Sequence, residues 1–372
     1  MSCFQKRREK IYDWMAQDGI ALVMVEDCEG RRNPSLRWLS GHPGDALLFL
    51  SADRQSLIVP WDFNMANLYA DADAMIPYKE FGRLPIRALL GAADHLKIPK
   101  GAKIEIPNLC SYPQFLGFVE EVPDHDIICR KGGVWDELEK FRAVKDEGEI
   151  KIYRKLSAQT DEIIKLLENH IRAGNLKTEL DVAQFIDSEG RKRGCEGTGF
   201  ETLAAGPERS VGIHAFPTYT GGAFGGPGFS ILDFGLKYAG YTSDVTLTFA
   251  GEPLSKTQEK MLSIVEKAYK LALSMVKPGE STRNISLAVD TYYGRHKKYL
   301  EHGLGHGIGL QAHEAPFLRS RADSEWILEP GMIITLEPGI YDPVHGGCRL
   351  ENDVLITEAG AEVLTEARII QL

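Results

Sequence analysis

Four carboxylates and one imidazole in the C-terminal part of the sequence have residue types and settings that suit metal chemistry. They lie in the strings ILDFG, SDVTLTF, HGLGHGIG, ITLEPGIY and RLENDVLIT, and they are Asp233, Asp244, His306, Glu337 and Glu351. Each string is apolar and strand-like, and a buried carboxylate is costly unless it is paired or coordinates a metal. Four such acids converging with a histidine indicate a site for two divalent cations.

The acids occur in two similar strand–turn–strand patterns. The apolar run 229–233 ends on Asp233, GLKYAG provides turn residues, and the strand-like run 241–249 contains Asp244. The run 332–337 ends on Glu337, continues through PGIY, and is followed by CRLENDVLIT, which contains Glu351. A lone acid at a strand end is usually a turn or capping residue. The matched pairs instead favour a weak internal duplication, in which each of two hairpins supplies two carboxylates.

Length and composition predict a soluble two-domain protein. The chain of 372 residues exceeds what one hydrophobic core usually supports. Its net charge of -10 argues against nucleic acid or an anionic membrane as a partner. The N-terminal residues lack an apolar signal core, and no run of about 18 apolar residues occurs. The six cysteines are scattered, so we expect reduced thiols and a cytoplasmic location.

The order of elements predicts two different domains. Residues 5–17 read as a helix, and four apolar runs read as strands, which indicates a smaller α/β domain over 1–140 (strands 21–25, 46–50, 56–60 and 103–107). A larger domain is expected over 141–372. There, two helices precede each acidic hairpin, which predicts an α+β architecture with a pseudo-twofold helix–helix–hairpin repeat (helices from 150, and over 178–194, 255–279 and 285–300).

These motifs together resemble those of a known enzyme family. The order D-x10-D, GHGIG, EPGIY and R-x-E before a strand resembles the pita-bread metallopeptidases, which include Xaa-Pro dipeptidases (prolidases), aminopeptidase P and methionine aminopeptidases. SLRWLSGHPGDALLFL at 35–50 is similar to the start of the creatinase/prolidase N-terminal domain, and FRAVKDEGEI at 141–150 is similar to the family's domain junction. The resemblance covers nearly the whole chain, and the N-terminal domain favours the proline-directed branch.

The resemblance implies a role for each metal-site residue. Asp233 would chelate one ion, Asp244 and Glu351 would bridge both, and His306 and Glu337 would complete the second. Two divalent ions per chain are implied, Mn(II) or Co(II) first, with Zn(II) or Fe(II) as alternatives. The ions would lower the pKa of a bridging water from about 15.7 towards about 7. The resulting hydroxide would attack the scissile carbonyl, and Glu337 would shuttle the proton to the leaving nitrogen.

Further residues are implied to serve catalysis and substrate binding. His214, His302 and His313 would face the peptide and donate hydrogen bonds to its carbonyl groups. Arg349 would orient acidic groups or the end of the substrate. The sequence departs from the family pattern at Leu247, where arginine is common, and at Asn352, where aspartate is common. Both changes leave the five proposed ligands in place.

The expected function is hydrolysis of the Xaa-Pro bond at the N-terminus of dipeptides or short peptides. Two alternatives remain at this stage, a creatinase-like amidinohydrolase that works without metals and a non-catalytic pita-bread binding protein. Both branches tend to lose metal ligands. We also expect a homodimer whose N-terminal domain helps to wall the substrate site. The sequence leaves open whether the enzyme acts as a dipeptidase or an aminopeptidase.

Overall fold

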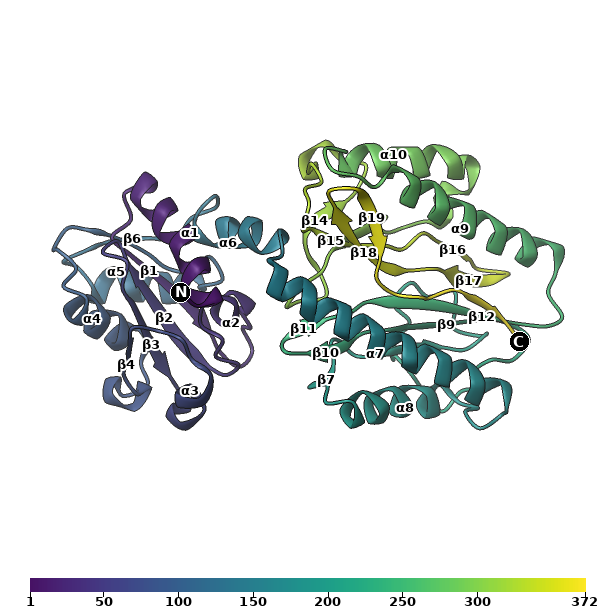
Figure 1. Ribbon diagram of the computed structural model, residues 1–372, viewed down its shortest axis with the longest axis horizontal. Helices are drawn as coiled ribbons and strands as arrows, with labels where there is room; N and C mark the ends of the chain where they lie inside the picture. Colours follow the sequence, from purple (N-terminus) through teal and green to yellow (C-terminus); the bar gives the residue numbers. More distant parts are fainter. The chain divides into compact units, whose positions relative to one another are not determined.

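The computed structural model describes the backbone of residues 1–372 and every side chain except those of Lys298 and Tyr299. The chain forms two compact units, Met1–Arg142 and Ala143–Leu372 (Figure 1). Among the described residues, no helix is long and apolar enough to cross a membrane.

The first unit is built around a six-stranded mixed sheet. The strand order is β4-β3-β2-β1-β5-β6 (Ala74–Met75, Ser56–Pro60, Ala46–Ser51, Leu22–Asp27, Lys103–Glu105 and Asp126–Ile128). The four apolar runs that read as strands in the sequence correspond to β1, β2, β3 and β5. The helices of this part of the chain are α1 to α6 and the 3-10 helix η1 (Cys3–Asp18, Pro34–Ser40, Phe63–Tyr69, Pro85–His95, Tyr112–Glu121, Val134–Ala143; η1, Tyr78–Phe81).

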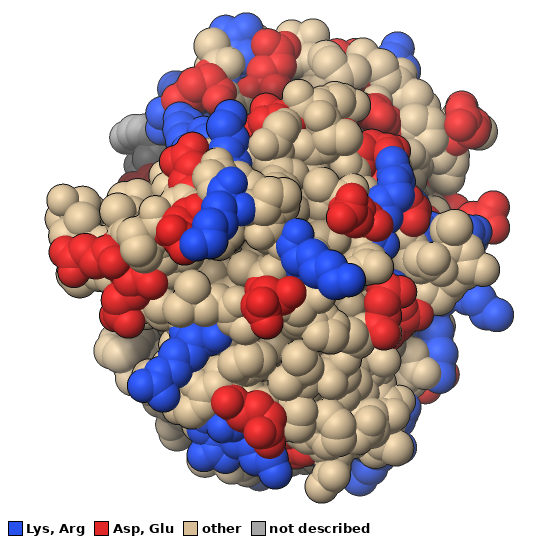
Figure 2. All heavy atoms as spheres, turned by 90° about the vertical axis from the view of Figure 1, so that its left-hand side faces the viewer, with Lys and Arg blue, Asp and Glu red and all other residues tan. Residues whose placement is uncertain are grey.

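Acidic and basic side chains are interspersed over the face that Figure 2 displays. This face therefore presents no extended surface of one charge sign.

Two helix pairs flank the strands of the second unit. In Figure 1, α7 (Glu147–Arg172) and α8 (Glu179–Lys192) lie along one side of the strands, and α9 (Lys256–Met275) and α10 (Thr282–Tyr293) lie along the opposite side. A capping box begins α9, because the Ser255 and Gln258 side chains each accept from the other residue's backbone N–H.

The predicted helix over 285–300 is wrong at its C-terminal end. The α-helix stops at Tyr293, because Gly294 takes a positive φ of 51°, and the 3-10 helix η2 (Gly294–Tyr299) follows. Likewise, α9 ends at Met275, four residues before the predicted end of the helix at residue 279.

Each predicted acidic hairpin is a long strand pair with a second, shorter strand pair between its two strands in the chain. In the first, β9 (Gly228–Phe234) pairs with β12 (Val245–Gly251), and the shorter β10 (Leu236–Tyr238) and β11 (Tyr241–Thr242) lie between them in the chain. In the second, β15 (Ile333–Leu336) pairs with β18 (Asn352–Thr357), with β16 (Gly339–Asp342) and β17 (Gly346–Arg349) between them. The helix–helix–hairpin order therefore occurs twice, as the sequence predicts.

The single strand predicted over 241–249 is interrupted at Ser243 and Asp244. Two backbone segments approach closely at this point, since a Cβ on Gly235 would lie 1.8 Å from the carbonyl oxygen of Ser243. Only glycine permits that approach. Asp244 therefore lies at the break between β11 and β12, next to this close approach.

The remaining strands complete two sheets that share one apolar core. The sheet orders are β20-β12-β9-β8 and β14-β13-β15-β18-β19 (β8, Leu203–Ala205; β13, Gly305–Gly307; β14, Glu314–Leu318; β19, Gly360–Val363; β20, Ile369–Gln371). Beside them lie the sheet β11-β10-β7 and the 3-10 helix η3 (β7, Gly197–Thr198; η3, Ala322–Ser324). An isolated bridge between Thr246 and Glu351 joins the two halves of the repeat.

Candidate metal centre

The four acids meet where the paired strands break. Asp233 lies near the end of β9, Asp244 directly precedes β12, Glu337 directly follows β15, and Glu351 directly precedes β18. The Glu351 N–H donates to the Thr246 carbonyl oxygen at 3.1 Å, and the Thr246 hydroxyl donates to Glu351 Oε2 at 2.7 Å. The repeat therefore brings four carboxylates from distant parts of the chain to one place.

The donor atoms form overlapping groups of the size that a metal ion needs. Within each group, one ligand-type atom per residue lies within 4.8 Å of the others, and the groups are Asp233–Asp244–Glu351, His306–Glu337–Glu351 and Asp244–His306–His313. The first two groups contain all five residues that the sequence singled out. They share Glu351, which gives this carboxylate the position that a bridge between two ions requires.

His306 presents a bare nitrogen to the acids. Its Nδ1 lies 3.1 Å from the Gly307 carbonyl oxygen and donates to it, so Nε2 carries the lone pair. Nε2 lies 3.8 Å from Asp244 Oδ2 and 3.6 Å from Glu337 Oε1, too far for hydrogen bonds. Burial, reinforced by His313, lowers the pKa of His306 to about 3. A neutral nitrogen facing two carboxylates fits a cation held between them.

Burial and mutual repulsion raise the pKa values of the carboxylates. Burial and then the charge of Asp233 raise the pKa of Glu351 to about 7. Burial and then the charge of Glu351 hold the pKa values of Asp244 and Glu337 well above their usual range. Carboxylates this close cannot all be ionised without a compensating charge. The donor set therefore fits divalent cations.

The two carboxylate oxygens of Asp233 differ in their partners. Its Oδ2 accepts from Arg349 Nη2 at 2.6 Å, whereas its buried Oδ1 has no hydrogen-bond partner among the described residues. Arg349 also donates to the Thr246 hydroxyl at 2.9 Å and to the Tyr341 hydroxyl at 2.7 Å. The arginine thus fixes one carboxylate oxygen and leaves the other open to an ion.

Tyr341 is a site residue that the sequence reasoning missed. Its hydroxyl accepts from Arg349 and donates to His302 Nε2 at 2.9 Å, because His302 Nδ1 donates to the Gly303 carbonyl oxygen at 2.7 Å. The available signal was its place in EPGIY, the same string as Glu337.

His302 has both ring nitrogens engaged inside the protein. Burial, and secondarily the charge of Arg349, lower its pKa to about 3. Its Nδ1 also lies 3.6 Å from Glu337 Oε2. In this arrangement no ring N–H of His302 remains for a peptide carbonyl, and its predicted contact with substrate stays a prediction.

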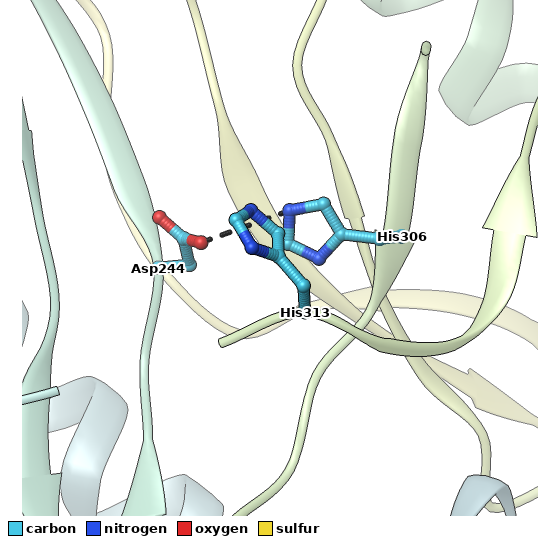
Figure 3. Close-up of side chains that lie close together, drawn as sticks. All are labelled: Asp244, His306 and His313. Atoms are coloured by element: carbon cyan, nitrogen blue, oxygen red, sulfur yellow. Dashed lines mark ion pairs between the residues drawn. The ribbon is translucent and has the colours of Figure 1, made fainter. Parts of the chain in front are cut away.

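His313 and His214 are both exposed, and His313 lies close to Asp244 and His306. Figure 3 shows the rings of His313 and His306 next to each other and opposite Asp244. The ring centroids lie 4.3 Å apart, and the angle between the ring planes is 80°. Burial lowers the pKa of His313, and His214 contributes to lowering the pKa of both His302 and His313, which places the three histidines in one electrostatic environment. His214 lies next to Ile213, whose carbonyl oxygen accepts from Arg349 Nη1 at 3.2 Å.

The two departures from the family pattern have structural explanations. Leu247 is fully buried opposite Leu232 and belongs to the apolar core. Asn352 binds the segment before β20: its Oδ1 accepts from Ala367 N at 2.7 Å, and its Nδ2 donates to the Ala367 carbonyl oxygen at 3.1 Å.

Asp353 is a second residue that the sequence reasoning missed. It is fully buried, and its Oδ2 accepts from the backbone N–H of Asp244 at 3.2 Å. The signal was its place two residues after Glu351 in RLENDVLIT. Asp353 therefore fixes the backbone of one proposed bridging ligand.

Comparison with known proteins agrees with this geometry. The sequence model of metallopeptidase family M24 matches residues 151–358, more than half of the chain. The chain belongs to metallopeptidase family M24. The matched segment contains all five candidate ligands, and the membership confirms a peptidase over an amidinohydrolase or a non-catalytic binding protein.

Relatives align with this M24 member over nearly their full length. It is 29% identical over 373 residues to an Xaa-Pro dipeptidase of Pyrococcus horikoshii, covering 98% of both chains. Among solved structures, an Xaa-Pro dipeptidase from Bacillus anthracis superposes with a TM-score of 0.85 at 26% identity, covering 99% of this chain and 100% of the other. An X-Pro aminopeptidase from Thermotoga maritima gives a TM-score of 0.82 at 28% identity, covering 98% and 100%. The predicted pita-bread fold is confirmed.

Proposed function

We propose that this M24 member is a dinuclear metal-dependent peptidase that hydrolyses the Xaa-Pro bond at the N-terminus of dipeptides or short peptides. The observation that carries the proposal is the pair of ligand groups that share the buried Glu351. The substrate class is supported by the full-length similarity to Xaa-Pro dipeptidases and to an X-Pro aminopeptidase.

Five side chains would hold the two ions. The unpartnered Oδ1 of Asp233 suits one ion, and Nε2 of His306 with Glu337 suits the other. Asp244 and Glu351 would bridge them. The oxygen-rich donor set favours Mn(II) or Co(II), with Zn(II) or Fe(II) as alternatives. When bound, the ions supply a lowered pKa for a coordinated water and stabilise negative charge at the scissile carbonyl.

The protein's own groups would orient the peptide and move the proton. Glu337 would accept a proton from the attacking water and return it to the proline nitrogen, since its carboxylate lies among the proposed ligands, 3.6 Å from His306 Nε2. His313 and His214, which are both exposed, would donate to peptide carbonyl groups. Arg349 and Tyr341 keep Asp233 and His302 in place.

His313 has a place in one of the three donor groups, but we propose it as a substrate contact. Its ring is exposed, whereas the side chains of His306, Asp244 and Glu351 are buried. An exposed ring beside a buried ligand is better suited to a peptide that enters from solvent.

The unit Ala143–Leu372 would then be the catalytic domain, and Met1–Arg142 would be the N-terminal domain of the creatinase/prolidase type. We propose a homodimer formed with the help of the N-terminal domain. Support comes from apolar side chains exposed on and beside α3, where Trp61, Leu68 and Tyr69 are 52%, 72% and 53% exposed. A cytoplasmic location is supported by the six free cysteines.

A substrate profile tests the proposed function. Purified protein loaded with Mn(II) is incubated with Xaa-Pro dipeptides, with Xaa-Pro-Yaa tripeptides and with Xaa-Ala dipeptides as a matched control. We expect metal-dependent release of the first residue from the proline peptides only. Preference for dipeptides would identify a dipeptidase, and cleavage of tripeptides would identify an aminopeptidase. Failure to cleave any proline peptide would refute the assignment.

A further inference from the structure

A buried carboxylate with an unusual number of donors lies at the first residue of α8. Glu179 is 1% exposed. Its Oε1 accepts from the Gly206 N–H at 2.7 Å, and its Oε2 accepts from the Thr220 N–H at 2.7 Å and the Thr220 hydroxyl at 2.6 Å. Arg209 Nη1 also donates to Oε2 and forms an ion pair with it. Charge-assisted hydrogen bonds of this kind are about twice as strong as neutral ones.

These donors bracket one loop. Residues 206–220 contain no helix or strand, and they carry His214 and Phe216, whose side chain is 93% exposed. Gly206 lies at one end of the loop and Thr220 at the other, so one carboxylate holds both ends together. Long loops without regular structure in a compact domain are usually functional or disordered.

The same carboxylate reaches the middle of the loop through Arg209. The second nitrogen of that guanidinium, Nη2, donates to the Pro217 carbonyl oxygen, three residues beyond His214. A Cβ on Gly206 would lie 1.9 Å from the Ala223 carbonyl oxygen, so the backbone approach at the loop's base needs glycine. Glu179 therefore binds both ends of the loop directly, and it is linked to Pro217 through Arg209.

The loop is also attached on the side of the proposed metal site. Arg349 Nη1 donates to the Ile213 carbonyl oxygen at 3.2 Å, and the Gly347 N–H donates to the Ser210 hydroxyl at 3.2 Å. His214 thus lies between an anchor at the metal site and an anchor at Glu179, while its own ring remains exposed.

We propose that Glu179 is a positioning residue that holds His214 at the reaction site, an inference that rests on the proposed function. Loss of its charge would weaken all four of these hydrogen bonds, and an amide nitrogen in place of either oxygen would leave one end of the loop without its acceptor. Misplacement of a substrate-contacting group by about 1 Å costs on the order of 100-fold in rate.

Glu179→Gln tests this role, with Glu189→Gln as the matched control. Glu189 lies on the same helix and pairs only with Lys192 and Arg193 in the described structure, away from the loop. We expect Glu179→Gln to keep the wild-type metal content, to lose about 100-fold in kcat/KM on an Xaa-Pro dipeptide, and to show faster amide hydrogen exchange over 206–220. Glu189→Gln should match wild type in all three measurements.

A double variant separates positioning from general destabilisation. If Glu179 acts through His214, then Glu179→Gln combined with His214→Ala should be no slower than His214→Ala alone. Multiplicative losses, or a normal kcat/KM with unchanged exchange in Glu179→Gln, would overturn the proposal.

A second, conservative variant keeps the proposal testable if Glu179→Gln folds poorly. Glu179→Asp keeps the carboxylate and should recover most of the activity and the slow exchange. An equal loss in Glu179→Asp with unchanged exchange would also overturn the proposal. If the wild type cleaves no Xaa-Pro peptide, the proposed function fails, whereas slow exchange over 206–220 that Glu179→Gln abolishes would still show that Glu179 holds the loop.

Discussion

Replacing Arg349 by methionine should destabilise the metal-free protein strongly. Arg349 is 1% exposed and donates to Asp233, Thr246, Tyr341 and the Ile213 carbonyl group. Methionine fills much of the same volume and donates nothing. The change therefore leaves the Asp233 carboxylate without its counter-charge and leaves neighbouring hydroxyl and carbonyl groups without a donor.

The expected loss is set by the unpaired acid. Removing one partner of a buried ion pair costs about 3–5 kcal/mol. For a unit of the size of Ala143–Leu372, each kcal/mol lowers Tm by about 2–4 °C, so we expect a fall of about 10 °C. Arg349→Lys keeps the charge but loses the planar fork, and should fall by less. Adding Asp233→Asn to Arg349→Met removes the orphaned charge and should recover part of the loss.

Scanning calorimetry of each variant, metal-free and loaded with Mn(II), measures these effects. Loading should reduce the loss in Arg349→Met, since the proposed ion supplies positive charge next to Asp233. A Tm for Arg349→Met within about 2 °C of wild type without metal would refute the reasoning, as would a double variant less stable than Arg349→Met alone.

Three further predictions concern the ions, the histidines and the assembly. Metal binding should release protons, because the pKa of Glu351 is about 7 without metal and the ion binds only the ionised carboxylate. The metal affinity should therefore fall as the pH drops below 7. Calorimetry in two buffers measures the proton release, and its absence would contradict the ligand assignment. His302→Ala and His313→Ala should keep both ions and lower kcat, whereas His306→Ala should lose affinity for one ion. A wild-type kcat/KM in His302→Ala and His313→Ala would show that these two histidines are structural. Sedimentation should show about twice the chain mass of 41.3 kDa, and a fully active monomer would exclude any need for a partner.

The candidate ligands could be predicted from the sequence because acidic residues are unusual in apolar, strand-like segments. An acid at the end of an apolar run, such as Asp233 or Glu337, is costly to bury unless it is paired or coordinates a metal. The repeated hairpin pattern also predicted the repeat of the second unit. Both inferences depend on local patterns, which a single sequence preserves.

Features that depend on contacts between distant segments were not accessible. The break at Asp244 adjoins the close approach of Gly235 to Ser243, which no periodicity reveals. Tyr341 and Asp353 lie in the same strings as Glu337 and Glu351, but their roles depend on hydrogen bonds made across the fold. Tyr341 bonds His302 and Arg349, and Asp353 bonds the Asp244 backbone.

The most direct test of a dinuclear metallopeptidase is to count ions and turnover in the same sample. Protein stripped by a chelator is titrated with Mn(II) while bound metal and hydrolysis of an Xaa-Pro dipeptide are measured together, with Asp244→Ala alongside. We predict no turnover without metal, two bound ions per chain at full activity, and loss of both metal and activity in Asp244→Ala. Full turnover in the stripped protein, or normal metal content and turnover in Asp244→Ala, would contradict the proposed site.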